Sequence, residues 1–107
     1  MRTDLVRGHL DGLLLAVLDE APGHGYEIIE RLAARSGGAF DLPEGTIYPA
    51  LHRLERSGDA TSEWSSVDGR RRRVYRLTAA GRRARGAARS DWQAFAGAVN
   101  RVMGAAA

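Results

Sequence analysis

Residues 45–78 constrain the fold of this chain more than any other stretch. They begin with GTIYPALHRLERSG, in which four apolar residues fall on one narrow side of a helix: Ile47, Ala50, Leu51 and Leu54. Two stretches with strand character follow, at about 60–66 and 71–77, and the Asp-Gly pair between them favours a tight turn. We therefore predict an amphipathic helix followed by a two-stranded hairpin with four arginines at its tip.

Three more helices complete the predicted organisation. Apolar spacings of three and four predict a first helix that ends at the APGHG of residues 21–25, and a second from about His24 to Arg35. After Thr78, a natural N-cap, residues 79 to about 103 contain no proline and many alanines, which predicts a long terminal helix. The chain is therefore predicted to be α+β, mainly α, with the element order of a winged helix-turn-helix domain.

Length and composition exclude several classes of protein. With 107 residues there is room for one domain, and the absence of cysteine excludes disulfide scaffolds and thiolate metal sites. The longest apolar run, Leu13 to Leu18, is too short to cross a bilayer or to serve as a signal core. We expect a soluble cytoplasmic protein without a cofactor.

The positive charge is concentrated in the last third of the chain. Residues 1–69 hold six arginines against twelve acids, whereas residues 70–107 hold ten arginines against Asp91 alone. All sixteen cations are arginine, which suits bidentate phosphate contacts but also follows from a GC-rich coding bias. The basic part is therefore the hairpin and the terminal helix.

Four consecutive arginines at a hairpin tip repel one another unless an anion is nearby, and a polyanion removes that cost. We expect Arg70 and Arg71, nearest the tip, to follow or enter a minor groove. Arg72 and Arg73 are expected to diverge onto opposite faces of the strand. For Arg73, a salt bridge to a nearby acid is the alternative: Glu63, Asp59 or Glu55.

The exposed side of the helix at 45–56 carries groups that bind nucleic acid. The helical period places five residues there: Tyr48, Pro49, His52, Arg53 and Arg56. Arginine can bind guanine O6 and N7 together, and tyrosine and histidine can donate to phosphate oxygens. The alternative is an ordinary solvated face, which would be more mixed in charge. Together with the basic hairpin, this face of the helix predicts that the partner is double-stranded DNA.

An apolar seam runs along the terminal helix. Its residues are spaced by four, three, four and three, which is a coiled-coil period: Ala88, Trp92, Phe95, Val99 and Val102. A single small domain cannot fully cover this seam. We expect it to form a two-fold homodimer interface together with Leu5, His9 and Leu10, and a dimer suits a palindromic operator.

Three motifs identify a family. HGYEIIERL at 24–32, GTIYPALHRLERSG at 45–58 and GRRRRVYRLTAAG at 69–81 resemble, in this order and at these spacings, the PadR-type transcriptional regulators. The resemblance covers essentially the whole chain, and its size is similar to the smaller subgroup with one C-terminal helix. It implies a winged helix-turn-helix domain over 1–78 with a two-stranded wing, and a C-terminal dimerisation helix over 79–107.

The resemblance also implies a function for particular residues. It implies a homodimeric repressor whose third helix enters the major groove and whose hairpin approaches the minor groove or backbone. By position, the expected DNA contacts are Tyr26, Thr46, Tyr48, Pro49, His52, Arg53, Arg70, Arg71 and Arg72. In some relatives an aromatic residue of the last helix lines a pore for planar hydrophobic compounds. Trp92 holds the corresponding place here, and a simple interface anchor is its alternative role.

The histidines and the fold bear on two other classes of function. His9, His24 and His52 are scattered, with no carboxylate in a metal-binding pattern and no nucleophile motif, so we expect neither an enzyme nor a metal site. His24, in the turn before the second helix, is expected to cap or pack. A winged helix that binds protein or RNA stays open, because a fold alone does not fix function.

Overall fold

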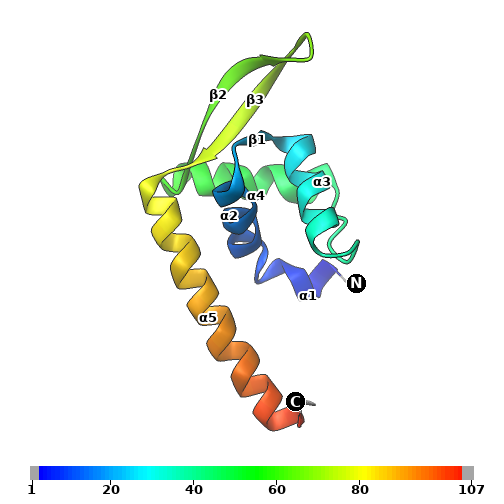
Figure 1. Cartoon of the computed structure of the whole chain (residues 1–107), viewed down its shortest axis with the longest axis vertical. Helices are drawn as coiled ribbons and strands as arrows, with labels where there is room; N and C mark the ends of the chain where they lie inside the picture. The colour runs from blue at the N-terminus through cyan, green and yellow to red at the C-terminus, as the bar shows by residue number, and fades with distance from the viewer. Residues whose placement is uncertain (1–2, 105–107) are drawn as a thin grey trace.

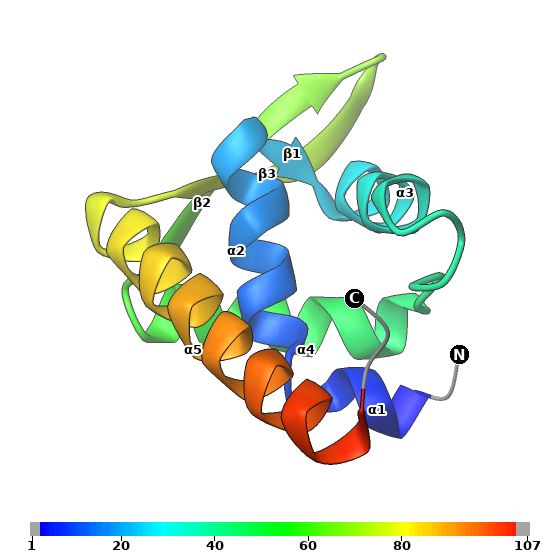
Figure 2. The same cartoon turned by 60° about the horizontal axis from the view of Figure 1, so that its bottom comes forward.

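Residues 10–20 form the helix at the centre of the molecule. The computed structural model describes residues 3–104, and its elements follow in this order: α1 (Thr3–Arg7), α2 (Leu10–Glu20), β1 (Gly23–His24), α3 (Gly25–Arg35), α4 (Glu44–Arg56), β2 (Ala60–Val67), β3 (Arg70–Leu77) and α5 (Ala79–Met103). Helix α2 packs against α3, α4, α5 and β3 (Figures 1 and 2). The predicted mainly α winged helix-turn-helix fold is confirmed.

The core is built from the apolar faces that the helical period predicted. All four residues of the predicted α4 stripe are buried, and α2 contributes a second set: Leu10, Leu14, Leu15, Val17 and Leu18. Tyr75 of β3 is only 1% exposed and joins this core from the root of the hairpin. Burial of apolar surface therefore fixes the hairpin to the helices.

The first predicted helix is in fact two helices, so the prediction of one continuous helix was wrong. Residues Gly8 and His9 interrupt it, and the N–H of His9 donates to the carbonyl of Val6 at 2.8 Å. Glycine has a low helix propensity, which makes an interruption at Gly8 inexpensive. Helix α1 leaves α2 at an angle (Figure 1), and Val6 and Leu10 on either side of the break are both buried.

The hairpin closes with the turn that its sequence predicts. Asp68 and Gly69 have φ angles of 51° and 75°, and two positive φ angles in a two-residue turn match the twist of the flanking strands. Strand β3 also pairs on its other side with β1, giving an antiparallel sheet of order β1-β3-β2. The short strand β1 was not predicted.

Helix α5 begins at the predicted cap and extends beyond the rest of the molecule. The hydroxyl of Thr78 accepts from the N–H of Gly81 at 3.0 Å and donates to the carbonyl of Gly58 at 2.7 Å. The first half of α5 packs against α2, and the second half continues away from the hairpin, which gives extents of 52 × 27 × 20 Å (Figure 1). Within residues 3–104, no helix combines the length and apolar character needed to cross a membrane.

Two glycines of α5 predict opposite effects of the same substitution. A methyl group at Gly81 would collide with the Asp59 carbonyl and stand 2.7 Å from Leu77 Cδ1, whereas one at Gly86 would meet nothing within 4 Å. We expect Gly81→Ala to lower the free energy of unfolding by about 1–3 kcal/mol. Gly86→Ala should raise it by about 0.5–1 kcal/mol, because alanine favours the helix.

Chemical denaturation of both variants at one protein concentration checks this pair. Equal effects of the two substitutions would show that helix propensity alone decides the result, and would contradict the close approach of α5 to Asp59.

Candidate nucleic-acid interface

The arginines of β3 divide between the two faces of the hairpin. On one face, the guanidinium carbon of Arg72 lies 5.0 Å from the ring centre of Tyr26 at the start of α3. On the other, Nε of Arg73 donates to Ser62 Oγ at 2.7 Å, and Nη2 lies 3.7 Å from the Glu55 carboxylate of α4. The predicted divergence is confirmed, and Glu55 is the acid that pairs with Arg73.

Arg70 and Arg71 lie near the tip of the hairpin, and both are exposed. Neither forms an ion pair with an acid in the part of the chain that the structure describes. Arg70 and Arg72 help to line an open groove of about 440 Å³ between the hairpin and α3, together with His24, Tyr26, Glu30, Val67 and Asp68. Arginines of the hairpin and Tyr26 therefore share one concave surface.

Two tyrosines and one acid connect this surface to α4. Tyr26 is 47% exposed, and the hydrogen bond of its hydroxyl to Glu44 raises the pKa of the phenol above its usual value. Burial raises the pKa of Tyr48, with a further contribution from Glu44 that Arg72 opposes. Both phenols are therefore neutral hydrogen-bond donors at physiological pH.

Tyr48 packs more deeply than the sequence predicted. Its phenol lies directly against Gly25, where any added side chain would collide with it, and it is only partly exposed. Tyr48, predicted on the exposed side of α4, is therefore only partly exposed, because a contact between α3 and α4 covers one side of the ring. The tyrosine therefore lies on the flank of α4 that faces the start of α3.

The outer face of α4 carries Pro49, His52 and Arg56, and all three are exposed. Arg53 lies on the flank toward α2, where its Nη2 donates to Asp11 at 2.9 Å. Thr46 lies on the same flank in a hollow of about 240 Å³, which Val6, Arg7, Leu10, Leu42, Gly45, Pro49 and Arg53 also line.

Arg56 was placed on this face by the helical period but was not among the expected contacts. It lies on the outer face with His52, and no acid in residues 3–104 pairs with it. The signal that could have selected it is its spacing of four from His52 and three from Arg53.

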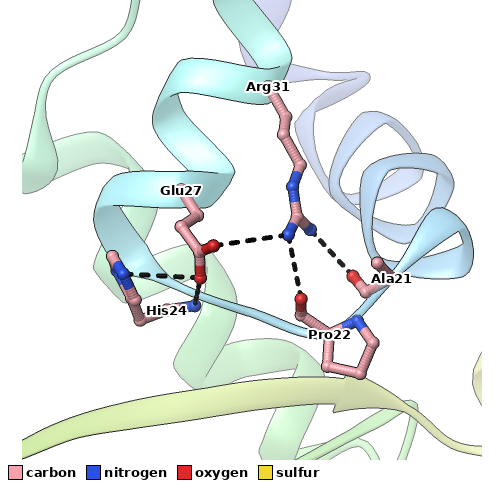
Figure 3. A network of polar contacts seen from close by, with 5 residues as sticks. All are labelled: Ala21, Pro22, His24, Glu27 and Arg31. Atoms are coloured by element: carbon pink, nitrogen blue, oxygen red, sulfur yellow. Dashed lines mark hydrogen bonds and ion pairs between the residues drawn. The ribbon is translucent and has the colours of Figure 1, made fainter. Parts of the chain in front are cut away.

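Arg31 closes the turn that leads into α3 (Figure 3). Its terminal nitrogens donate to the carbonyls of Ala21 and Pro22 at 2.8 and 2.9 Å, and Nη2 lies 3.7 Å from Glu27. Glu27 also accepts from the backbone N–H of His24 at 3.1 Å, which caps the first turn of α3. His24 has the capping position that the sequence predicted, and the network fixes the start of α3 beside the hairpin.

The second half of α5 exposes an aromatic cluster. The His9 ring lies edge-on to Trp92 at 5.0 Å and 6.0 Å from Phe95. Trp92 and Phe95 are 51% and 55% exposed, and Val102 and Met103 of the same helix and Leu5 of α1 are also exposed. Val99 is partly exposed.

Two residues expected in the dimer interface pack against their own chain: Leu10 is buried, and Ala88 is partly exposed. A methyl group added to Gly12 would stand 3.1 Å from the Cβ of Ala88, so α2 packs on this end of the seam. Leu10 is 3% exposed and belongs to the core. Local spacing placed both residues correctly on apolar faces but could not show which neighbour covers them. Among residues 3–104, no three His, Cys, Asp or Glu side chains gather as metal ligands.

Comparison with known proteins places this geometry in a family. Residues 14–87 match the family model described as the Transcriptional regulator PadR-like family. Transcriptional regulator Rv3488 of Mycobacterium tuberculosis is 51% identical over 61 residues, 57% of this chain and 54% of that protein. An uncharacterized protein X of Lysinibacillus sphaericus is 35% identical over 83 residues, 77% of this chain and 76% of that protein.

Solved structures share the same arrangement. A transcriptional regulator from Clostridium thermocellum superposes with a TM-score of 0.85 at 28% identity, covering 92% of this chain and 97% of that one. A PadR family regulator from Eggerthella lenta gives 0.82 at 31% identity, with 94% and 86% covered. The family consists of transcriptional regulators and not of enzymes, which confirms that prediction. By residues 14–87 and by its fold, the chain belongs to the PadR-like family of transcriptional regulators.

Proposed function

We propose that this chain is a sequence-specific repressor that binds a palindromic DNA operator as a homodimer in the cytoplasm. In this proposal residues 1–78 bind DNA and residues 79–107 hold the dimer together. The observation that carries it is the position of the exposed arginines. Arg70 and Arg72 line one groove with Tyr26 of α3, Arg71 lies on the other face of the same hairpin tip, and Tyr48 of α4 packs against Gly25 at the start of α3. A basic hairpin and a helix face thus adjoin, as major-groove and backbone contacts require.

Helix α4 would enter the major groove with His52, Pro49 and Arg56 foremost. Thr46 and Arg53 would reach bases or phosphates from one flank, Arg53 by exchanging its Asp11 partner for a phosphate. The Arg70 and Arg71 side chains would lie along the backbone or in the minor groove. Tyr48, on the opposite flank of α4, would donate a hydrogen bond from its phenol to the DNA.

Tyr26 would bind a phosphate oxygen next to Arg72. Glu44 raises the pKa of this phenol, so the hydroxyl is protonated and can donate to a phosphate oxygen. The proximity of Arg72 would bring a cation and a phenol to the same phosphate.

The dimer would form on the apolar face that α5 exposes. A monomer leaves Trp92, Phe95 and Val102 in contact with water, together with Leu5 on α1. Exposed apolar surface of this kind marks a site of association, and a second copy presents the same seam to it by two-fold symmetry.

We also propose that a small hydrophobic or aromatic ligand relieves repression by binding near Trp92. The support is the half-exposed cluster of Trp92, Phe95 and His9, because aromatic rings stack on planar compounds.

Selection of bound sites from random duplexes tests the function as a whole. We expect the selected sites to be inverted repeats whose half-site centres lie about one helical turn, or a multiple of it, apart. Selection of no preferred duplex, with tight binding to RNA or to a protein instead, would identify the alternative function of a winged-helix interaction module.

The salt dependence of duplex binding should decrease when the hairpin tip is stripped of its charge. We expect Arg70→Ala and Arg71→Ala each to flatten the slope of log K against log salt by about 0.9 for every phosphate that the arginine neutralised. Arg101→Ala, which removes the same charge at the far end of α5 (Figure 1), is the matched control and should leave the slope unchanged. Equal slopes for all three variants would show that the salt dependence follows the net charge of the protein and not the position of the arginines.

Phe95→Asp should convert the dimer to a monomer. A carboxylate in the centre of an apolar interface gives up its hydration without gaining a partner, which opposes association. Light scattering should then give the 11.6 kDa of one chain, about half the mass of the wild type. Ser90→Asp, on the exposed side of the same helix, is the control and should stay dimeric. A wild-type protein that is already monomeric at micromolar concentration rules out the proposed dimer.

Trp92→Ala separates ligand binding from dimerisation. If Trp92 binds ligand, we expect this variant to keep its mass and its operator affinity while planar aromatic compounds no longer release it from DNA. Release measured by fluorescence anisotropy, with mass measured in parallel, checks this. An unchanged response to the compounds removes the ligand role, and dissociation of the dimer assigns Trp92 to the interface.

A further inference from the structure

Trp64 lies on the hairpin face that carries Arg71 and Arg73. It stands directly opposite Arg73 in the pairing of β2 with β3, and the two-residue repeat of a strand puts Arg71 on the same face. The guanidinium carbons of Arg71 and Arg73 lie 5.0 and 5.5 Å from the centre of the Trp64 ring. Both distances are within the range of a cation–π interaction, so one indole holds two cations.

The two arginines differ in the charge that remains for another partner. Arg73 donates to Ser62 at 2.7 Å, and the Ser62 hydroxyl donates in turn to Glu55 at 2.7 Å. Glu55 also pairs with Arg73 directly, so the charge of Arg73 is balanced within the protein. Arg71 has no acidic partner in residues 3–104, and its guanidinium lies instead against the indole of Trp64.

Core packing does not account for a tryptophan at this position. Trp64 is 56% exposed, in a strand whose central residues face water. An indole that stays half exposed to water contributes little of the hydrophobic stabilisation that a buried indole would give. The cationic groups over its ring are the two guanidinium groups, which points to a role in arranging them.

We propose that Trp64 is a positioning residue for DNA binding and acts through Arg71. The indole, seated against the anchored Arg73, holds the Arg71 guanidinium in an extended position on the hairpin face. A side chain already ordered in the free protein gives up less conformational entropy when it binds a phosphate. In this arrangement Arg71 contacts the DNA phosphate, Arg73 supports the indole, and Trp64 sets the direction in which the Arg71 side chain points. This inference rests on the proposed DNA-binding function.

Binding of a short mixed-sequence duplex by Trp64→Leu and Trp64→Phe tests the inference. Leucine removes the π face, so we expect affinity at low salt to fall about two- to fivefold and the salt slope to move toward that of Arg71→Gln. Phenylalanine restores the π face and should restore most of the affinity. The double variant Trp64→Leu with Arg71→Gln should bind no more weakly than Arg71→Gln alone, because both changes remove the same contact.

Melting temperatures measured on the same samples separate positioning from stability. A merely structural Trp64 would lower the melting temperature and leave the salt slope of the folded protein unchanged, and that result overturns the inference. The inference is also overturned if the affinity of the double variant is reduced by the product of the two single reductions. If the wild-type protein has no affinity for duplex DNA at low salt, the proposed function itself fails. If the wild-type protein binds duplex DNA and Trp64→Leu binds it equally well, only the role of Trp64 is refuted.

Discussion

The bridge from Arg73 through Ser62 to Glu55 determines where the hairpin points. A two-stranded hairpin is only marginally stable by itself in water, so its orientation depends on what holds its root. Tyr75 anchors that root in the core, and the bridge fixes one face of β3 to the end of α4. On the opposite face, Arg72 rests on an aromatic ring of α3. The hairpin therefore leaves the body in a defined direction, and Arg70 and Arg71 near its tip have no acidic partner among residues 3–104.

The start of α2 connects the two ends of the molecule. Within a short stretch of chain, His9 lies against Trp92 of α5, Asp11 pairs with Arg53 of α4, and Gly12 lies under the first half of α5. The contacts with the aromatic cluster of α5 and with Arg53 are therefore made by His9 and Asp11, which are two positions apart in the chain. This arrangement gives the proposed ligand a short physical route to the proposed DNA-binding helix.

Local signals predicted most of the fold, and long-range contacts account for what they missed. The Thr78 cap, the Asp-Gly turn and the apolar stripe of α4 each depend on residues close together in the chain, and all were correct. Strand β1 exists because residues 23–24 meet β3 much later in the chain. The cover over Tyr48 depends on the absence of a side chain at Gly25, and the partner of Arg53 comes from α2. For the candidate site, residue types and the helical face could be predicted from local spacing, whereas the pairing of each cation depends on tertiary contacts.

Amide chemical shifts measured during titration with the selected duplex test the central claim most directly. We expect the largest changes at the hairpin tip, at the start of α3 and along the outer face of α4, with the last turns of α5 unaffected. The hairpin tip and the start of α3 line one groove, and α4 packs against the start of α3 through Tyr48, so the shifts of the three segments should change together at one DNA concentration. Changes confined to α5, or no changes at low salt, would contradict a continuous DNA-binding surface.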